Sequence, residues 1–520
     1  MTNARIGRYL RKRHSVRVFC LVAAAIVGTA ALATVAGPSR ADEVTISQNQ
    51  LRTGWDPHEP SLTPQLLQSG TFRKLFATPV TGQVYAQPLV VGTSVIVATE
   101  NDNVYSLNAQ TGAVNWKLSL GPAWPSSVTG CLDIHPWIGI TSTPVYNPAT
   151  GQVYVAAVVN NGPSLYVPNV YLAAINARTG HRDWQSQVRG APVNDRTHPF
   201  DPLTERQRAS LLLMNGRVYM GFGSYCDFRS YVGLVAGVNT ATHAVTLWSD
   251  EVRPGGSGAG IWMGGGGLVS DGSGRIFVAS GNGGSPPAGP GSKPPSDLGD
   301  SVIRLGVQAD GSLAARDFFS PANAPRLDAT DADLGSGGPV ALPFGTAAHP
   351  HLLVQAGKDG RIFVLDRGNL GGRGATADHP VSLNGPYKGQ WGHPAAFAGS
   401  GGNDYIYYLG AGDFLRALKF STSTARLTDT GNSSGTFSFG SGSPVVTSNG
   451  TSPASAIVWV VNQAGTRSAL DAFAAIPQGG KLRPLWSAPI GTASKFSVPA
   501  TDSGRVYVAT SDGRVFGFGK

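Results

Sequence analysis

The segment from Gly504 to Phe518, with the sequence GRVYVATSDGRVFGF, decides the fold of this 520-residue chain. Two runs of β-branched and aromatic residues flank Asp512-Gly513, a pair that favours a tight hairpin turn. The segment therefore predicts two antiparallel strands joined by a short turn. Similar segments recur along the chain, so this hairpin is one copy of a repeat.

The repeat extends over residues 71–520 and has about four strands in each copy. The first copy, Gln87 to Trp116, contains four β-like runs, whereas the last copy contains three. About eight copies predict an all-β fold, a β-propeller of about eight four-stranded blades. The sixth copy is weak, and merging it with a neighbour gives the alternative of seven blades. A strand at Thr71–Ala77 would complete the last blade and close the ring, which leaves no open sheet edge.

The first 41 residues differ from the rest and are predicted to be a signal peptide. A basic start precedes an apolar run at 18–36 and a small-x-small exit at residues 39–41. The protein is therefore expected to be secreted or extracytoplasmic. A retained membrane anchor is the alternative, because the apolar run is close to the length that spans a bilayer. Residues 42–70 are interpreted as an N-terminal arm and residues 71–520 as the propeller domain.

Removal of the predicted signal changes the charge and the cysteine content. Residues 1–41 carry seven Lys and Arg and no acid, so the formal charge falls from +9 to +2. This near balance argues against a nucleic-acid-binding surface, which needs a basic face. Cys131 and Cys226 remain, and outside the cytoplasm they are expected to form a disulfide, with two buried free thiols as the alternative. A monomer is expected.

The repeat pattern Val-Tyr-Val-Ala-Thr, Asp-Gly-x-Val-Tyr/Phe, Thr-Gly, Trp resembles that of the pyrroloquinoline-quinone (PQQ) propeller family. The resemblance covers nearly all of residues 71–520. It implies one of two functions. The first is a quinoprotein oxidoreductase that oxidises alcohols or sugars with PQQ and calcium and passes electrons to an external acceptor. The second is a non-catalytic scaffold that binds a protein or cell-envelope partner.

Individual positions resemble the cofactor site of quinoprotein alcohol dehydrogenases. The resemblance implies that Trp262 stacks on the quinone and that Lys358, before a Gly-Arg-Ile-Phe-Val-Leu-Asp strand, contacts the quinone oxygens. It implies that Asn282, in Ser-Gly-Asn, binds calcium.

Acidic positions complete this implied site. Asp331 and Asp333 resemble the acidic loop that supplies the catalytic base, and Asp227 stands near the position of a glutamate that binds calcium in the family. The chain departs from the family in lacking two adjacent cysteines. No Cys-x-x-Cys-His motif occurs, so no covalent haem is expected.

Propeller topology predicts that these residues share one rim. Asp227, Asn282 and Lys358 follow the second strands of their blades, whereas Trp262 and Asp333 precede inner strands. Both kinds of connection open on the same face, near the axis where a small molecule would bind. The alternative is that Asn and Asp at these places serve only as turn residues.

Overall fold

A computed structural model of the chain describes residues 43–253, 255–272 and 274–520. All of these residues belong to one compact unit. The predicted signal peptide at residues 1–41 lies outside the described residues. Within the described ranges, no helix is long and apolar enough to cross a membrane.

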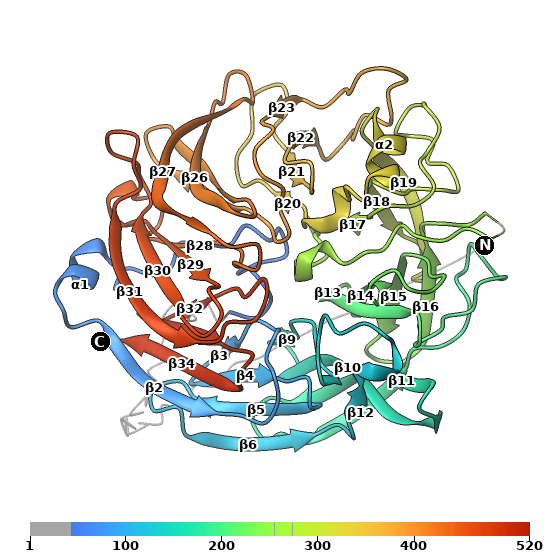
Figure 1. The fold of residues 1–520 in the computed structure, drawn as a ribbon, viewed down its shortest axis with the longest axis horizontal. Helices are drawn as coiled ribbons and strands as arrows, with labels where there is room; N and C mark the ends of the chain where they lie inside the picture. The colour runs from blue at the N-terminus through green and yellow to red at the C-terminus, as the bar shows by residue number, and fades with distance from the viewer. Residues whose placement is uncertain (1–42, 254, 273) are drawn as a thin grey trace, which may run out of the picture. The chain divides into compact units, whose positions relative to one another are not determined.

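Eight small antiparallel sheets form a ring, with their inner strands toward its centre (Figure 1). The first four sheets contain these strands: β3 (Leu89–Val91), β4 (Ser94–Ala98), β5 (Asn103–Asn108), β6 (Val114–Ser119); β9 (Val145–Asn147), β10 (Gln152–Ser164), β11 (Val167–Asn176), β12 (Arg182–Gln187); β13 (Glu205–Met214), β14 (Arg217–Ser224), β15 (Leu234–Asn239), β16 (Val245–Ser249); and β17 (Arg275–Ala279), β18 (Val302–Val307), β19 (Leu313–Phe319). In the fourth sheet the inner position is held by a bridge between Val269 and Phe277.

The other four sheets continue in chain order. They contain β20 (Val340–Ala341), β21 (Leu352–Ala356), β22 (Ile362–Asp366), β23 (Ser382–Asn384); β24 (Ala395–Gly399), β25 (Asn403–Leu409), β26 (Asp413–Phe420), β27 (Leu427–Phe437); β28 (Val445–Thr447), β29 (Ile457–Asn462), β30 (Ser468–Ala474), β31 (Pro484–Gly491), to which the short strand β1 (Trp55–Asp56) adds in parallel beside β28; and β32 (Ala500–Asp502), β33 (Arg505–Ala509), β34 (Arg514–Gly519) with β2 (Arg73–Pro79). The eight-bladed prediction is confirmed, and the seven-bladed alternative is wrong because the weak sixth copy forms a complete blade, β24 to β27.

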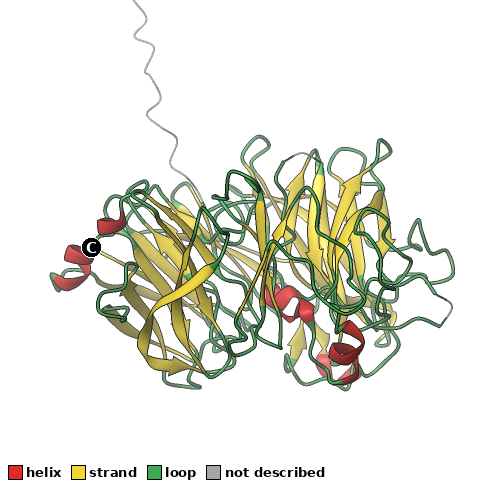
Figure 2. Ribbon diagram, turned by 90° about the horizontal axis from the view of Figure 1, so that it is seen from above, coloured by secondary structure: helices red, strands yellow, loops and turns green. Residues whose placement is uncertain are grey.

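Ring closure also follows the sequence prediction. Strand β2 pairs antiparallel with β34, with Lys74 opposite Phe518 and Thr78 opposite Val515. The N-terminal strand therefore supplies the outer strand that the last repeat lacks. The α-helices of the described residues are short: α1 (Pro64–Gln68) and α2 (Ala324–Ala329) lie in connections outside the sheets (Figure 2). Two short strands, β7 (Trp124–Pro125) and β8 (Trp137–Ile138), form a separate ribbon.

The blades are held together by apolar side chains of their middle strands. Between the first two blades, for example, Ile96 and Val104 belong to the same buried cluster as Val155 and Ile175. Such a cluster removes apolar surface from water, at about 25 cal/mol per Å². Since each blade packs mainly on its neighbours, the repeat pattern determines the architecture.

A segment that precedes the first blade contacts the inner edges of all eight blades. Residues 43–54 belong to the predicted N-terminal arm and are mostly buried. In six blades a backbone N–H donates to a carbonyl of this segment; the donors are Val90, Tyr146, Ser270, Ala341, Ala396 and Val446. In the other two blades the contact is made by a side chain of the segment: Arg52 donates to the carbonyl of Leu211, and Glu43 accepts from the backbone N–H of Thr501. This segment therefore ties the inner strands to one another.

Candidate functional site

A cleft of about 270 Å³ is lined by residues from several connections of the ring. Four residues singled out in the sequence line it together: Asp227, Trp262, Asp333 and Lys358. Asp227 follows β14 and Lys358 follows β21, whereas Trp262 and Asp333 lie in loops that lead to inner strands. The structure thus places these four side chains on one rim, as the topology of the repeat implies.

Trp262 is held by glycines and by one hydrogen bond. A Cβ atom added at Gly223, Gly260 or Gly281 would come closer than 3.0 Å to the indole, so only glycine leaves room for the ring at these positions. The indole Nε1 donates to the carbonyl of Ser224 at 3.1 Å. Trp262 is half-buried and lines the cleft. An aromatic ring fixed in this way can act as a platform for a flat ligand.

Lys358 joins the two predicted catalytic carboxylates. Its Nζ lies 2.6 Å from Asp331 Oδ1 and 2.5 Å from Asp333 Oδ2. Asn282 completes the network, because its backbone N–H donates to Asp333 Oδ1 at 2.7 Å and its amide Nδ2 to Asp331 Oδ1 at 3.0 Å. The structure therefore brings four predicted residues from two blades into direct contact.

The two carboxylates differ in environment. Asp333 is buried, and this burial raises its pKa despite the opposing charge of Lys358 and the hydrogen bond from Asn282. Asp331 is exposed, with 76% of its side chain accessible. Burial lowers the pKa of Lys358, but the neighbouring Asp333 and Asp331 carboxylates outweigh it, so the net pKa is raised and the amine stays charged. Of the two acids, Asp333 is the one suited to proton transfer.

The side chains present do not fit the predicted calcium ion. Calcium takes six to eight oxygen ligands, whereas Asp331 and Asp333 are paired with Lys358 and Asp227 accepts a hydrogen bond from Ser224 Oγ at 2.7 Å. In the described ranges, no group of three or more His, Cys, Asp or Glu side chains is arranged to hold a metal ion. The oxygen Oδ1 of Asn282 is buried without a hydrogen-bond partner, but one oxygen is not enough for a calcium site.

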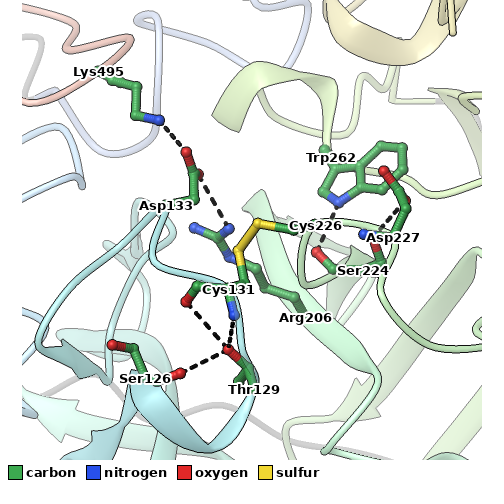
Figure 3. Close-up of a disulfide and its surroundings, with 10 residues drawn as sticks. All are labelled: Ser126, Thr129, Cys131, Asp133, Arg206, Ser224, Cys226, Asp227, Trp262 and Lys495. Carbon is green, nitrogen blue, oxygen red and sulfur yellow. Dashed lines mark hydrogen bonds and ion pairs between the residues drawn. A yellow bond between two sulfur atoms is a disulfide. The ribbon is translucent and has the colours of Figure 1, made fainter.

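A disulfide joins Cys131 and Cys226, whose Cα atoms are 5.6 Å apart, so the predicted pairing is confirmed. It links the loop after β7 to the loop after β14. Figure 3 shows the bridge between Trp262 and Asp227 on one side and Arg206 and Asp133 on the other. Since Cys226 also lines the cleft, the disulfide forms part of its wall.

The sequence interpretation missed the charged and aromatic residues on the other side of the cleft. These are Asp133, Arg206, Arg208, Trp391, Phe439, Lys495 and Phe496. Arg206-Gln207-Arg208 does carry a signal, because two charges stand in a strand, β13, that is otherwise mostly apolar and buried. The other residues lie in loops, where no repeated sequence pattern marks them as site residues.

A family model matches part of this chain. A family model described as "Outer membrane protein assembly factor BamB" matches residues 63–285. Among curated proteins, none matches the chain.

Solved structures resemble the fold at low sequence identity. Quinohemoprotein alcohol dehydrogenase from Comamonas testosteroni has a TM-score of 0.60 and 16% identity, over 92% of this chain and 80% of that one. A europium-containing methanol dehydrogenase has a TM-score of 0.61 and 14% identity, over 92% and 98%. BamB from Moraxella catarrhalis has a TM-score of 0.50 and 11% identity, over 86% and 100%. At these identities the likeness concerns the fold.

Proposed function

Because this chain is a β-propeller of the PQQ-type repeat family, we propose that it is an exported quinoprotein oxidoreductase that oxidises an alcohol or a sugar. The observation that carries the proposal is the gathering of Trp262, Asp333 and Lys358 on one cleft. These residues supply an aromatic platform, a carboxylate and an ammonium group, which can bind and orient a quinone and accept a substrate proton.

The cleft fits a flat, oxygen-rich cofactor such as PQQ. Its volume is close to the lower end of the range for small-molecule sites, about 300–1,000 Å³. The Trp262 indole and the Cys226 sulfur offer apolar surface, while Lys358 and neighbouring arginines offer positive charge. When bound, the quinone accepts the hydride that leaves the substrate carbon.

Asp333 is proposed to remove the hydroxyl proton of the substrate. It adjoins the platform, because a Cβ atom on Gly281 would come closer than 3.0 Å both to Asp333 Oδ1 and to the Trp262 ring. Its raised pKa makes the carboxylate a better base than an exposed aspartate. Lys358 orients that carboxylate and can donate to a ligand oxygen in the cleft. No step is assigned to calcium, and electrons would pass to an external acceptor.

A second candidate function is a scaffold that binds a protein partner. Leu132, Trp137 and Phe228 have exposed fractions of 64%, 39% and 63%. Leu132 follows Cys131 and Phe228 lies two residues after Cys226, so the disulfide brings two of these apolar side chains to the same region. Exposed apolar side chains that lie together mark interaction sites more often than single ones do.

Reconstitution distinguishes the two candidates. Residues 42–520 would be titrated with PQQ by absorbance and assayed for dye-linked oxidation of alcohols and aldoses. The oxidoreductase predicts saturable binding and turnover, both weakened at least tenfold by Lys358→Ala and unchanged by Lys481→Ala, an exposed lysine of the seventh blade. Absence of quinone binding would overturn the proposal and favour the scaffold, which predicts a partner whose binding is lost in Phe228→Ser.

A further inference from the structure

Two arginines of β13 face the cleft, although this strand is part of the buried interior. Arg206 and Arg208 are two residues apart, and a β-bulge between Gln207 and Ala209 shifts the register of β13 against β14 at Arg208. Both are buried, with exposed fractions of 7% and 8%, and both line the cleft. We infer that Arg206 and Arg208 form a subsite that binds carboxylate groups of a ligand, and that the cleft selects a flat organic acid.

Arg208 gives the strongest support for this inference, because little negative charge compensates its guanidinium. Its only hydrogen bond among the described residues is a long one, 3.4 Å from Nη2 to the carbonyl of Gly264, and no carboxylate there is within ion-pair distance. The guanidinium lies against Gly265, where any side chain would collide with it. Burial and repulsion from Arg206 lower the pKa of Arg208 to about 10. An arginine has five N–H donors, and most of those of Arg208 have no acceptor among the described residues.

Arg206 is only partly compensated. Its Nη1 lies 3.5 Å from Asp133 Oδ2, and Asp133 is also paired with Lys495 (Figure 3). Its Nε is buried without a hydrogen-bond partner. The carboxylate of Asp133 is therefore shared by Arg206 and Lys495. Arg208 has no carboxylate partner among the described residues.

The other acids near the cleft do not cancel this charge. Asp333 is held by Lys358, and Asp227 by Ser224. Glu100 interacts electrostatically with both arginines, but burial raises its pKa and so favours its neutral form. The cleft lining as a whole has four cationic and three anionic side chains. An uncompensated cation in a buried site is stabilised by binding an anion.

The geometry of the pair suits carboxylates. A guanidinium binds a carboxylate through two parallel N–H···O bonds. Because both arginines line the same cleft, two guanidinium groups are available to one ligand. With Trp262 on the same cleft, the ligand is a flat acid. Two ligands present such carboxylates, the quinone and a hydroxy-acid substrate, and the experiment separates these two sources.

The inference rests on the proposed function, because both take this cleft as the ligand site. It can be tested in protein without bound quinone. Isophthalate, a flat dicarboxylate, and isophthalamide, its uncharged analogue, would be titrated into residues 42–520 by calorimetry. We expect saturable binding of isophthalate, at least tenfold weaker binding of isophthalamide, and at least tenfold weaker isophthalate binding in Arg208→Gln. The control Arg182→Gln, at an exposed position of β12, should bind normally. Equal binding of the two compounds, or normal binding in Arg208→Gln, would overturn the inference.

Two further measurements keep the inference testable. If Arg208→Gln does not fold, Arg206→Gln is measured instead and should bind isophthalate at least tenfold more weakly. Normal isophthalate binding in Arg206→Gln would overturn the inference. In quinone-loaded protein, a loss of quinone affinity in Arg208→Gln assigns the carboxylates to the cofactor, whereas a fall in kcat/KM for hydroxy acids but not for neutral alcohols assigns them to the substrate. Isophthalate binding without quinone binding would refute the proposed function and leave the anion subsite standing.

Discussion

Two buried arginines, Arg52 and Arg208, lie in the same propeller and differ in how their donors are satisfied. Arg52 is fully buried and donates to the carbonyls of four residues and to a hydroxyl: Ile46, Asn49, Leu211, Leu268 and Thr45 Oγ1. Among the described residues, Arg208 donates only to the carbonyl of Gly264, at 3.4 Å. Burial lowers the pKa of both, to about 9 and about 10. The two arginines are similarly buried, but the N–H donors of Arg52 have acceptors and most of those of Arg208 do not. This difference separates a structural arginine from one that is available to a ligand.

The difference follows from the parts of the molecule to which they belong. Arg52 belongs to residues 43–54, the segment that contacts all eight inner strands, and its donors meet carbonyls of the third and fourth blades. Arg208 belongs to the cleft and stands at a β-bulge in the pairing of β13 with β14. Sites built for ligands often keep groups that reduce stability until the ligand binds.

The largest expected effect tests this comparison directly. Arg52→Met should lower the free energy of unfolding by about 5 kcal/mol, because several buried carbonyls lose their donors at about 1–3 kcal/mol each. Arg208→Met should change it by no more than about 1 kcal/mol, since it removes a charge with little compensation. Urea unfolding measures both values. Equal destabilisation by the two substitutions would show that the arginines have the same role.

The next effect concerns chemistry rather than stability. Asp333→Asn should reduce turnover of quinone-loaded protein at least a hundredfold, the usual range for loss of a general base, while quinone affinity changes less than tenfold. Because the pKa of Asp333 is raised, wild-type turnover should rise with pH in a range above the ordinary aspartate value of about 3.9. Asp331→Asn is the matched control, as this carboxylate is exposed. Equal losses in both variants would contradict the assignment.

The disulfide gives an effect of intermediate size on the cleft side. Joint replacement of Cys131 and Cys226 by serine should lower the free energy of unfolding by about 3 kcal/mol, because the bridge closes a loop of 95 residues. Isophthalate affinity should also fall, since the bridge fixes two loops of the cleft wall. Thermal unfolding would check the first result and calorimetry the second. Unchanged affinity would show that the bridge acts only on stability.

The smallest effect concerns Glu59, a buried carboxyl near the N-terminal segment. Burial, together with repulsion from Asp56, raises its pKa to about 8. A raised pKa means that its stabilising contribution is complete below the unfolded value of about 4.3 and is lost as pH rises toward 8. Glu59→Gln should therefore reduce the loss of stability between pH 5 and pH 8 by about 2 kcal/mol. An identical pH dependence in the variant would contradict this result.

Much of the fold could be predicted because each blade is a local unit. Strands such as β33 and β34 meet across the Asp512-Gly513 turn, so nearby residues specify their pairing. The weak sixth copy was harder to recognise, since its apolar runs are less regular, although it forms a complete blade. The rim shared by Trp262, Asp333 and Lys358 also followed from the order of strands and loops.

The sequence by itself determined the propeller, its closure by an N-terminal strand, and the face on which the site residues meet, because these depend on local repeats and their order. Only the tertiary structure decided which side chains are partners. Lys358 pairs with the carboxylates of Asp331 and Asp333, and Arg52 has five acceptors, whereas Arg208 has no carboxylate partner in the part of the chain that the structure describes. Such pairings join residues far apart in the chain through irregular loops, and burial decides which charges are satisfied, so no local pattern encodes them.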